Sequence, residues 1–294
     1  MANLKDIKRR IGSVEKTQQI TSAMRMVAAS KLRRAEAALK AARPYATRMK
    51  QTLGELAAAG GDAEHPLLEV REEIHKVELV VVTSDKGLAG AFNSSATKAA
   101  DQFIAERGHG IDELFITTIG KKAAEHYRRR RPSQLREVIE IGGGWIEYEW
   151  AAAIGRTLSE RYASGEVDQV VVVYNQFLSV MTQSPTVTTL LPFTPPETDE
   201  TGTEIDAEKL PYEFEPSAEK LLATLVPRAI EVELFAAALE NQAGEHAARM
   251  TAMESATRNT KDLIEALTLE YNRARQAAIT KELVEIVSGA QALE

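Results

Sequence analysis

The chain has 294 residues, a formal net charge of −7 and an apolar fraction of 44%, which is typical of a foldable chain and excludes the disordered and collagen-like classes. It contains no cysteine, which excludes a disulfide framework, a thiol nucleophile and a cysteine-based metal site, and fits a reducing compartment. No apolar run reaches about 18 residues, so the sequence predicts no membrane span, and the N-terminal segment lacks the apolar region of a secretory signal.

A heptad pattern runs through residues 1–60. With position a at Leu4 and position d at Ile7, thirteen of the sixteen a and d positions are apolar over eight heptads. This predicts one N-terminal coiled-coil helix over 1–60 that ends at Gly60-Gly61. Pro44 is its one helix breaker and predicts a nearby kink. At 1.5 Å per residue the helix would span roughly 80 Å, which is too long for a compact domain.

Positive charge is concentrated in this N-terminal helix. Residues 1–52 hold six lysines and seven arginines against three acidic residues, a net charge of +10, which leaves −17 for the rest of the chain. A basic segment indicates an acidic partner, which is nucleic acid, anionic lipid or an acidic protein surface. A solvated helix face is an equal alternative.

The segment 70–193 alternates between strand and helix patterns. Apolar runs rich in β-branched residues predict strands at 79–83, 113–119, 137–141, 168–177 and 186–193. Helical stretches separate them at 96–106, 121–130 and 147–163. This alternation predicts a central Rossmann-like α/β domain with a mostly parallel sheet. The following residues 194–215 contain three prolines and many acidic side chains, and we expect them to form an exposed acidic loop.

A second heptad pattern begins at Leu222 and predicts a C-terminal coiled-coil helix over 216–294. Pro227 lies near its start, where a helix tolerates proline best. Neither terminal helix can bury its apolar stripe alone. The simplest fold is therefore an antiparallel two-helix coiled coil of the N- and C-terminal helices, with the α/β domain beside it, and many seam alanines allow a close approach.

The stretch ELVVVTSDKGLAGAFN (78–93) joins a strand, a glycine turn and a helix start, which is an arrangement that holds phosphates in many proteins. A GxxxxGK[ST] loop requires a lysine and a Ser or Thr after its second glycine, whereas Gly90 is followed by Ala91 and Phe92. A dinucleotide fingerprint requires three glycines in GxGxxG spacing, and here Gly87 and Gly90 have GxxG spacing. A tight structural turn is favoured, and a weak anion contact at the preceding lysine stays open.

We predict no catalytic, cofactor or metal site. The five histidines lack metal-ligand spacing, and no GxSxG nucleophile motif is present. Two other features indicate a partner. The N-terminal seam becomes polar around Arg25, and the C-terminal helix ends in an apolar tip, although free helix ends are normally polar. The tip residues are Ile279, Leu283, Ile286 and Val287.

Several sequence blocks resemble one protein family over essentially the whole chain. These blocks are KTQQITSAMRMVAASKLRRA (16–35), TSDKGLAGAFN (83–93), YEFEP (212–216), YNRARQ (271–276) and ITKELVEIVSGAQAL (279–293). They are similar to the gamma subunit of the rotary F-type ATP synthase. The resemblance implies the same fold, an antiparallel coiled coil of the terminal helices with an α/β domain beside it.

The resemblance also implies a mechanical function. The chain would be a non-catalytic central stalk inside a ring of alternating alpha and beta subunits, resting on the membrane c-ring and holding the epsilon subunit. Proton flow would turn this rotor and drive the beta-subunit sites through their binding changes. The sequence shows no transit peptide, which favours a bacterial origin with a peripheral location on the cytoplasmic side of the inner membrane.

The family's contact residues carry over to matching positions. The resemblance implies a beta-subunit catch at Arg275, Gln276, Thr280 and Glu282, and a contact of Met24, Arg25 and Met26 with the acidic beta-subunit region. It implies a second catch at Lys86, where the family often has arginine, and contacts with epsilon and the rotor ring at Tyr212, Phe214 and Glu215. Two alternatives remain: a nucleotide-dependent α/β enzyme, suggested by the glycine turn, and a nucleic-acid-binding coiled coil, suggested by the +10 segment.

Overall fold

The computed structural model describes residues 4–60, 65–107, 110–198, 205, 214, 215 and 217–291. The chain divides into two compact units. One unit comprises Met1–Ala29 with Arg249–Glu294, and the other comprises Ser30–Ala248. Two long helices belong to both, α1 (Leu4–Gly60) and α5 (Ala218–Gln291). Most of the expected acidic loop lies outside the described residues.

The α/β domain lies within the larger unit. Its elements in chain order are β1 (Lys76–Val82), α2 (Phe92–Arg107), β2 (Glu113–Ile119), α3 (Lys121–Arg130), β3 (Leu135–Ile139), α4 (Tyr148–Ala163), β4 (Gln169–Phe177) and β5 (Gln183–Leu191). The strand order is β3-β2-β1-β4-β5, and all pairs are parallel except β4 with β5. The predicted Rossmann-like domain is confirmed, and its antiparallel edge strand follows from the short hairpin that connects β4 to β5.

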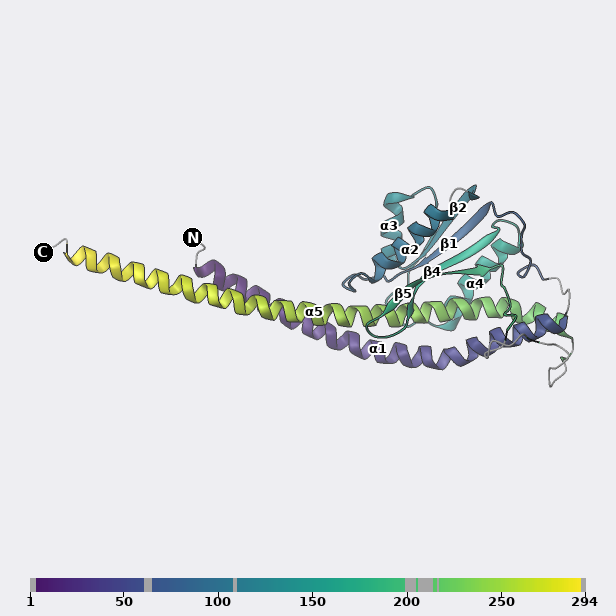
Figure 1. Cartoon of the computed structure of the whole chain (residues 1–294), viewed down its shortest axis with the longest axis horizontal. Coiled ribbons are helices and arrows are strands. Elements are labelled where there is room, and N and C mark those ends of the chain that lie inside the picture. The colour runs from purple at the N-terminus through teal and green to yellow at the C-terminus, as the bar shows by residue number, and fades with distance from the viewer. Residues whose placement is uncertain are drawn as a thin grey trace. The chain divides into compact units, whose positions relative to one another are not determined.

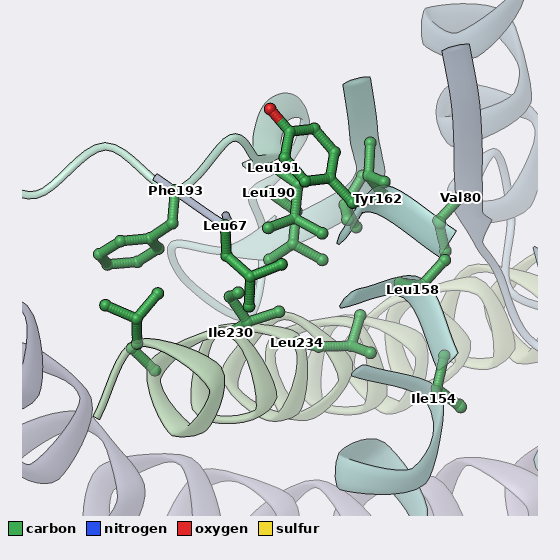
Figure 2. Close-up of a cluster of buried hydrophobic side chains, with 14 of the residues drawn as sticks. Leu67, Val80, Ile154, Leu158, Tyr162, Leu190, Leu191, Phe193, Ile230 and Leu234 are labelled. Carbon is green, nitrogen blue, oxygen red and sulfur yellow. The ribbon is translucent and has the colours of Figure 1, made fainter. Parts of the chain in front are cut away.

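The two faces of the sheet bury separate apolar clusters. Because side chains alternate along a strand, Leu79 and Val81 of β1 pack with residues of α2 and α3, whereas Val80 and Val82 pack with residues of α4 and α5. Figure 1 shows α2 and α3 on one side of the sheet and the α5 helix on the other. Figure 2 shows the cluster that contains Val80, in which Ile230 of α5 lies below Leu190 and Leu191 of β5.

A hydrogen-bonded aspartate fixes the amino ends of β1 and β4. Asp168 precedes β4 and accepts hydrogen bonds from the backbone N–H of His75 at 3.0 Å and of Lys76 at 2.8 Å, and from the guanidinium of Arg71. Burial raises the pKa of Asp168, but the amide of Lys76 and the Arg71 guanidinium outweigh burial, so its net pKa lies below the ordinary value. Ionised Asp168 therefore stabilises this end of the sheet.

The two long helices pair antiparallel in both units. In the larger unit Arg43 forms an ion pair with Glu240 at 2.9 Å, and Lys50 forms one with Glu233 at 2.7 Å. The partner on α5 therefore moves seven residues toward the N-terminus when the position on α1 moves seven residues toward the C-terminus, as antiparallel pairing requires. In the smaller unit Thr257 of α5 donates a hydrogen bond to Thr21 of α1 at 2.8 Å. Most predicted seam positions are buried or half-buried. The predicted coiled coil is confirmed. α1 continues through Pro44 as one helix, and a kink there stays a prediction.

Candidate interaction surfaces

The last turns of α5 carry an exposed apolar surface. Every residue from 279 to 288 is exposed. Ile279, Leu283, Val284, Ile286 and Val287 have exposed fractions of 50%, 57%, 58%, 68% and 56%. Large contiguous apolar surfaces on soluble proteins mark interaction sites. This segment, which we call the apolar tip (279–288), is therefore the first candidate surface.

Two of the predicted contact residues on α5, Arg275 and Gln276, precede the apolar tip, and the other two, Thr280 and Glu282, lie within it. Arg275, Gln276, Thr280 and Glu282 are all exposed. At helical spacing, Gln276 and Thr280 continue along the helix surface into Leu283. The structure therefore brings together hydrogen-bonding side chains and apolar side chains on one stretch of helix.

The predicted contact residues on α1 separate into two groups. The heptad pattern placed Arg25 at a seam position, and this placement is wrong, because Arg25 is exposed. Met24 is half-buried between the buried Thr21 and Ala28, so it fills the seam at this turn. A guanidinium keeps its hydration at the surface, whereas a flexible thioether fills a gap. Met26 is 60% exposed and points out beside Arg25.

The glycine turn between β1 and α2 satisfies its own polar groups. Ser84 N donates to Asn93 Oδ1 at 2.9 Å. Asp85 accepts hydrogen bonds from the backbone N–H of Lys121 at 3.0 Å and of Gly142 at 2.8 Å. The Asp85 carboxylate therefore accepts hydrogen bonds from two backbone amides at this edge of the sheet. Its negative charge disfavours the binding of a phosphate here. Lys86 is exposed on the outside of this turn.

The comparisons with known proteins agree over the whole chain. The family model described as ATP synthase matches residues 3–293. The ATP synthase gamma chain of Anaeromyxobacter sp. (strain Fw109-5) is 47% identical over 298 residues, and that of Pelotomaculum thermopropionicum is 47% identical over 294 residues. Both alignments cover 100% of each chain. The chain belongs to the ATP synthase gamma chain family. The resemblance seen in the sequence blocks is confirmed.

Solved structures give the same fold. A chain of the Tetrahymena thermophila mitochondrial ATP synthase central stalk and c-ring aligns with a TM-score of 0.61 and 25% identity, covering 81% of this chain and 99% of that chain. A chain of the Euglena gracilis mitochondrial ATP synthase aligns with a TM-score of 0.71 and 18% identity, covering 99% and 94%. The second likeness concerns the fold alone. As a member of the gamma chain family, the protein is a central-stalk subunit.

The third predicted surface of this family member is only partly described. Phe214 is half-buried and packs against the cluster that joins β4, α4 and α5, whereas Glu215 is exposed. Tyr212 lies outside the described residues. The half-buried phenyl ring of Phe214 anchors the chain just before α5 begins, beside the exposed carboxylate of Glu215.

Sequence reasoning missed one group of polar residues in α5. Every residue from 237 to 248 except Glu245 is buried. This segment contains Glu240, Asn241 and Gln242, whose side chains bond to the end of β4 and to two loops of the α/β domain. The heptad pattern predicts only the side of α5 that packs against α1, so it does not indicate that the other sides of the helix are buried as well. The one feature of the sequence that could have indicated these contacts is the run of three consecutive polar residues in an alanine-rich stretch of helix.

A cavity of about 340 Å³ lies between α1, α5 and the two strands β4 and β5. The ion pairs of Arg43 with Glu240 and of Lys50 with Glu233 line it and already neutralise its charges. Burial, with the nearby carboxylate of Glu240, raises the pKa of Tyr174 in its wall to about 12. This tyrosine stays protonated at neutral pH and serves as a wall of the cavity.

The described part of the chain offers neither a metal site nor a membrane span. Within it, no group of three His, Asp or Glu residues is placed to hold a metal ion. None of its helices combines the length and apolarity that crossing a membrane requires.

Proposed function

We propose that the chain is the rotor of a proton-translocating ATP synthase, coupling proton flow through the membrane ring to conformational change at the beta-subunit catalytic sites, without being catalytic itself. The observation that carries this proposal is the full-length match to gamma chains. In this proposal the helices 1–60 and 216–294 form the shaft, and the domain 70–193 lies beside it. The acidic stretch 195–208 has no assigned role.

The apolar tip would turn inside an apolar sleeve of the alpha and beta subunits. Hydrophobic contacts are non-directional, so one apolar surface can rotate against another without breaking specific bonds. The five exposed apolar side chains of the tip support this part of the proposal. A polar tip would remain hydrated and would exchange directional hydrogen bonds at each step.

Hydrogen bonds to the beta subunits would give the rotation its defined steps. Arg275, Gln276 and Thr280 would meet a beta-subunit catch loop, with Glu282 two residues further along. The exposure of all four side chains supports this contact. Arginine and glutamine present several donors, and hydrogen bonds to charged groups are among the stronger ones.

The basic helix α1 would face the acidic beta-subunit region. Arg25 and Met26 are exposed there, while Met24 supports them from the seam. Lys86 would form a second catch from the glycine turn. Long-range attraction between a basic helix and acidic loops favours repeated encounter, and screening by salt keeps each contact weak.

The foot of the rotor would hold the epsilon subunit and rest on the c-ring, through Tyr212, Phe214 and Glu215. The exposed carboxylate of Glu215 supports this surface. The relatives with full-length alignments are bacterial proteins. We therefore place the complex at the bacterial inner membrane, with this chain peripheral on the cytoplasmic side.

Two observations disfavour a nucleotide-dependent enzyme. Asp85 places a carboxylate in the glycine turn, where it accepts hydrogen bonds from the backbone N–H of Lys121 and Gly142, and buried α5 residues bond to the carboxyl-end loops of the sheet. Calorimetry with ATP, ADP and NAD on the isolated chain tests this directly, and binding tighter than about millimolar would revive the enzyme hypothesis. A shift of DNA or RNA at low salt would likewise revive the nucleic-acid hypothesis.

Co-purification tests the proposed function. The tagged chain, expressed with the rest of its complex, should bring down alpha, beta and epsilon subunits in stoichiometric amounts. The isolated chain should hydrolyse no ATP. Robust turnover by the purified chain, or its recovery without these subunits, would refute the proposal.

A further inference from the structure

The carboxyl edge of the sheet is the place where open α/β sheets bind ligands, in the crevice where the strand order reverses. The order β3-β2-β1-β4-β5 puts this reversal between β1 and β4. The loops that follow β1, β3 and β4 meet at this edge because those strands are parallel. A segment of α5 bonds to the loops after β1 and β3 and to the last residue of β4.

Glu240 holds the carboxyl end of β4 at its last residue, Phe177. One carboxylate oxygen accepts a hydrogen bond from the backbone N–H of Phe177 at 2.7 Å, and the other accepts one from Arg43 of α1 at 2.9 Å. Glu240 is 8% exposed. One buried carboxylate therefore joins the β4–β5 hairpin, α5 and α1.

The next two residues hold the loops after β1 and β3. Asn241 Nδ2 donates to the carbonyl oxygen of Thr83, after β1, at 3.2 Å. Gln242 Nε2 donates to the carbonyl oxygen of Gly144, after β3, at 3.0 Å. Asn241 and Gln242 are 1% and 5% exposed. Both acceptors are backbone carbonyls; Thr83 is buried, whereas Gly144 is exposed.

Apolar packing continues the contact along α5. Ala89 of the turn and Phe92, the first residue of α2, form a small buried cluster with Ala248 of α5. A Cβ added to Gly244 would lie 2.9 Å from Cε2 of Phe92 and 3.3 Å from Cγ of Gln183. The helix backbone therefore approaches the α/β domain more closely than any larger residue allows.

Three consecutive helical residues point in directions about 100° apart, so Glu240, Asn241 and Gln242 cover about 200° of the helix circumference. Rolling α5 in either direction would break at least one of these bonds. A broken bond leaves a buried polar group without a partner, which costs more than the bond itself contributes. The geometry resists rotation of the helix within the domain.

We infer that Glu240, Asn241 and Gln242 are positioning residues that fasten the carboxyl edge of the sheet to α5, so that the α/β domain and this helix segment move as one body. The mechanical consequence, transmission of torque from the domain to the shaft without slip, rests on the proposed function. The fastening itself is a property of the isolated chain and is tested separately.

Hydrogen exchange on the isolated chain tests the fastening. E240Q keeps the side-chain shape but leaves one acceptor for two donors, and N241D and Q242E replace a donor by a carboxylate facing a carbonyl. Each variant should lower the protection of the loops 83–91, 140–146 and 178–182 together, by at least about tenfold. The matched control E233Q breaks the ion pair with Lys50 at 2.7 Å and should leave these loops unchanged.

Unchanged protection in all three variants, or a loss confined to the one loop beside each substitution, would overturn the inference. If a variant fails to fold, the double substitution A89C/A248C keeps the test open, because the chain has no other cysteine. Oxidation of this pair should leave proton pumping by the complete complex within about twofold. Loss of pumping that reduction reverses would mean that the domain and α5 must separate, which contradicts the inference.

The complete complex tests the consequence. E240Q and N241D should retain ATP hydrolysis within about twofold while protons pumped per ATP fall by more than about twofold, and E233Q should change neither. Unchanged pumping per ATP in both variants would refute the coupling role. If the wild-type complex hydrolyses ATP without pumping, the proposed function fails, whereas the exchange experiment still decides whether the fastening exists.

Discussion

Gly244→Ala tests the close approach of α5 to the α/β domain. Glycine inside a helix is normally a weakness, and alanine would stabilise a free helix by about 1 kcal/mol. Here the added methyl would lie 2.9 Å from Phe92, a side chain that is 4% exposed and has little room to move. Overpacking of this kind costs about 1–3 kcal/mol. The variant should therefore gain nothing or lose up to about 2 kcal/mol of unfolding free energy.

Gly12→Ala in α1 is the matched control, because nothing lies within 4 Å of its added Cβ. It should gain the full helix-propensity term of about 1 kcal/mol. Phe92→Leu removes the ring atoms that meet the new methyl. The double variant of Phe92→Leu with Gly244→Ala should therefore be about 1–3 kcal/mol more stable than the sum of the single effects.

Urea unfolding followed by circular dichroism measures these differences. Two results would refute the reasoning. One is a Gly244→Ala protein that is stabilised as much as Gly12→Ala, and the other is additivity of the two substitutions within about 0.5 kcal/mol. Either result would mean that α5 and the turn do not approach as closely as the structure indicates.

Three further predictions concern the contacts and the buried charges. Arg275→Leu should leave the circular dichroism spectrum intact but impair assembly or ATPase activity coupled to proton transport, and wild-type behaviour of the substituted complex would contradict the predicted catch. Glu78 is 0% exposed and paired with Arg161 at 2.6 Å and Arg136 at 3.3 Å, so Glu78→Leu should lower the free energy of unfolding by about 3–5 kcal/mol. Replacing both arginines by Met as well should recover much of this stability, and no recovery would refute the ion-pair account. Asp168→Asn should lower the free energy of unfolding at pH 7 by about 1–3 kcal/mol. Because the pKa of Asp168 is lowered in the folded state, the difference in stability from the wild type should vanish as the pH falls from about 4 through that pKa. A difference that persists at pH 2 would contradict the stabilising role of the ionised carboxylate.

Periodicity predicted most of the fold. The heptads located both long helices, because burial of a coiled-coil seam repeats every seven residues over the whole helix. The strands of the sheet were located by their β-branched runs, since both faces are covered by helices and need apolar side chains. β1 begins three residues earlier than expected, at Lys76. The polar Glu78 obscured that start, and only its pairing with distant arginines makes it compatible with a buried strand.

The contacts around α5 could not be predicted in the same way. Glu240, Asn241 and Gln242 are separated from their partners by 63, 158 and 98 residues. Such pairs follow from tertiary geometry, which no local pattern records. At Arg25 a strict heptad also failed, because the hydration of a guanidinium outweighed one seam position that Met24 could fill. The predicted partner contacts stay predictions.

Observation of rotation tests the central claim most directly. Lys98 on α2 is exposed, and the chain has no cysteine, so K98C gives a single attachment point for a bead in a complex whose other subunits carry no reactive cysteine. With the alpha and beta subunits fixed to a surface, the bead should rotate in one direction when ATP is added and stop when ATP is removed. A complex that hydrolyses ATP while the attached bead does not rotate would contradict the account.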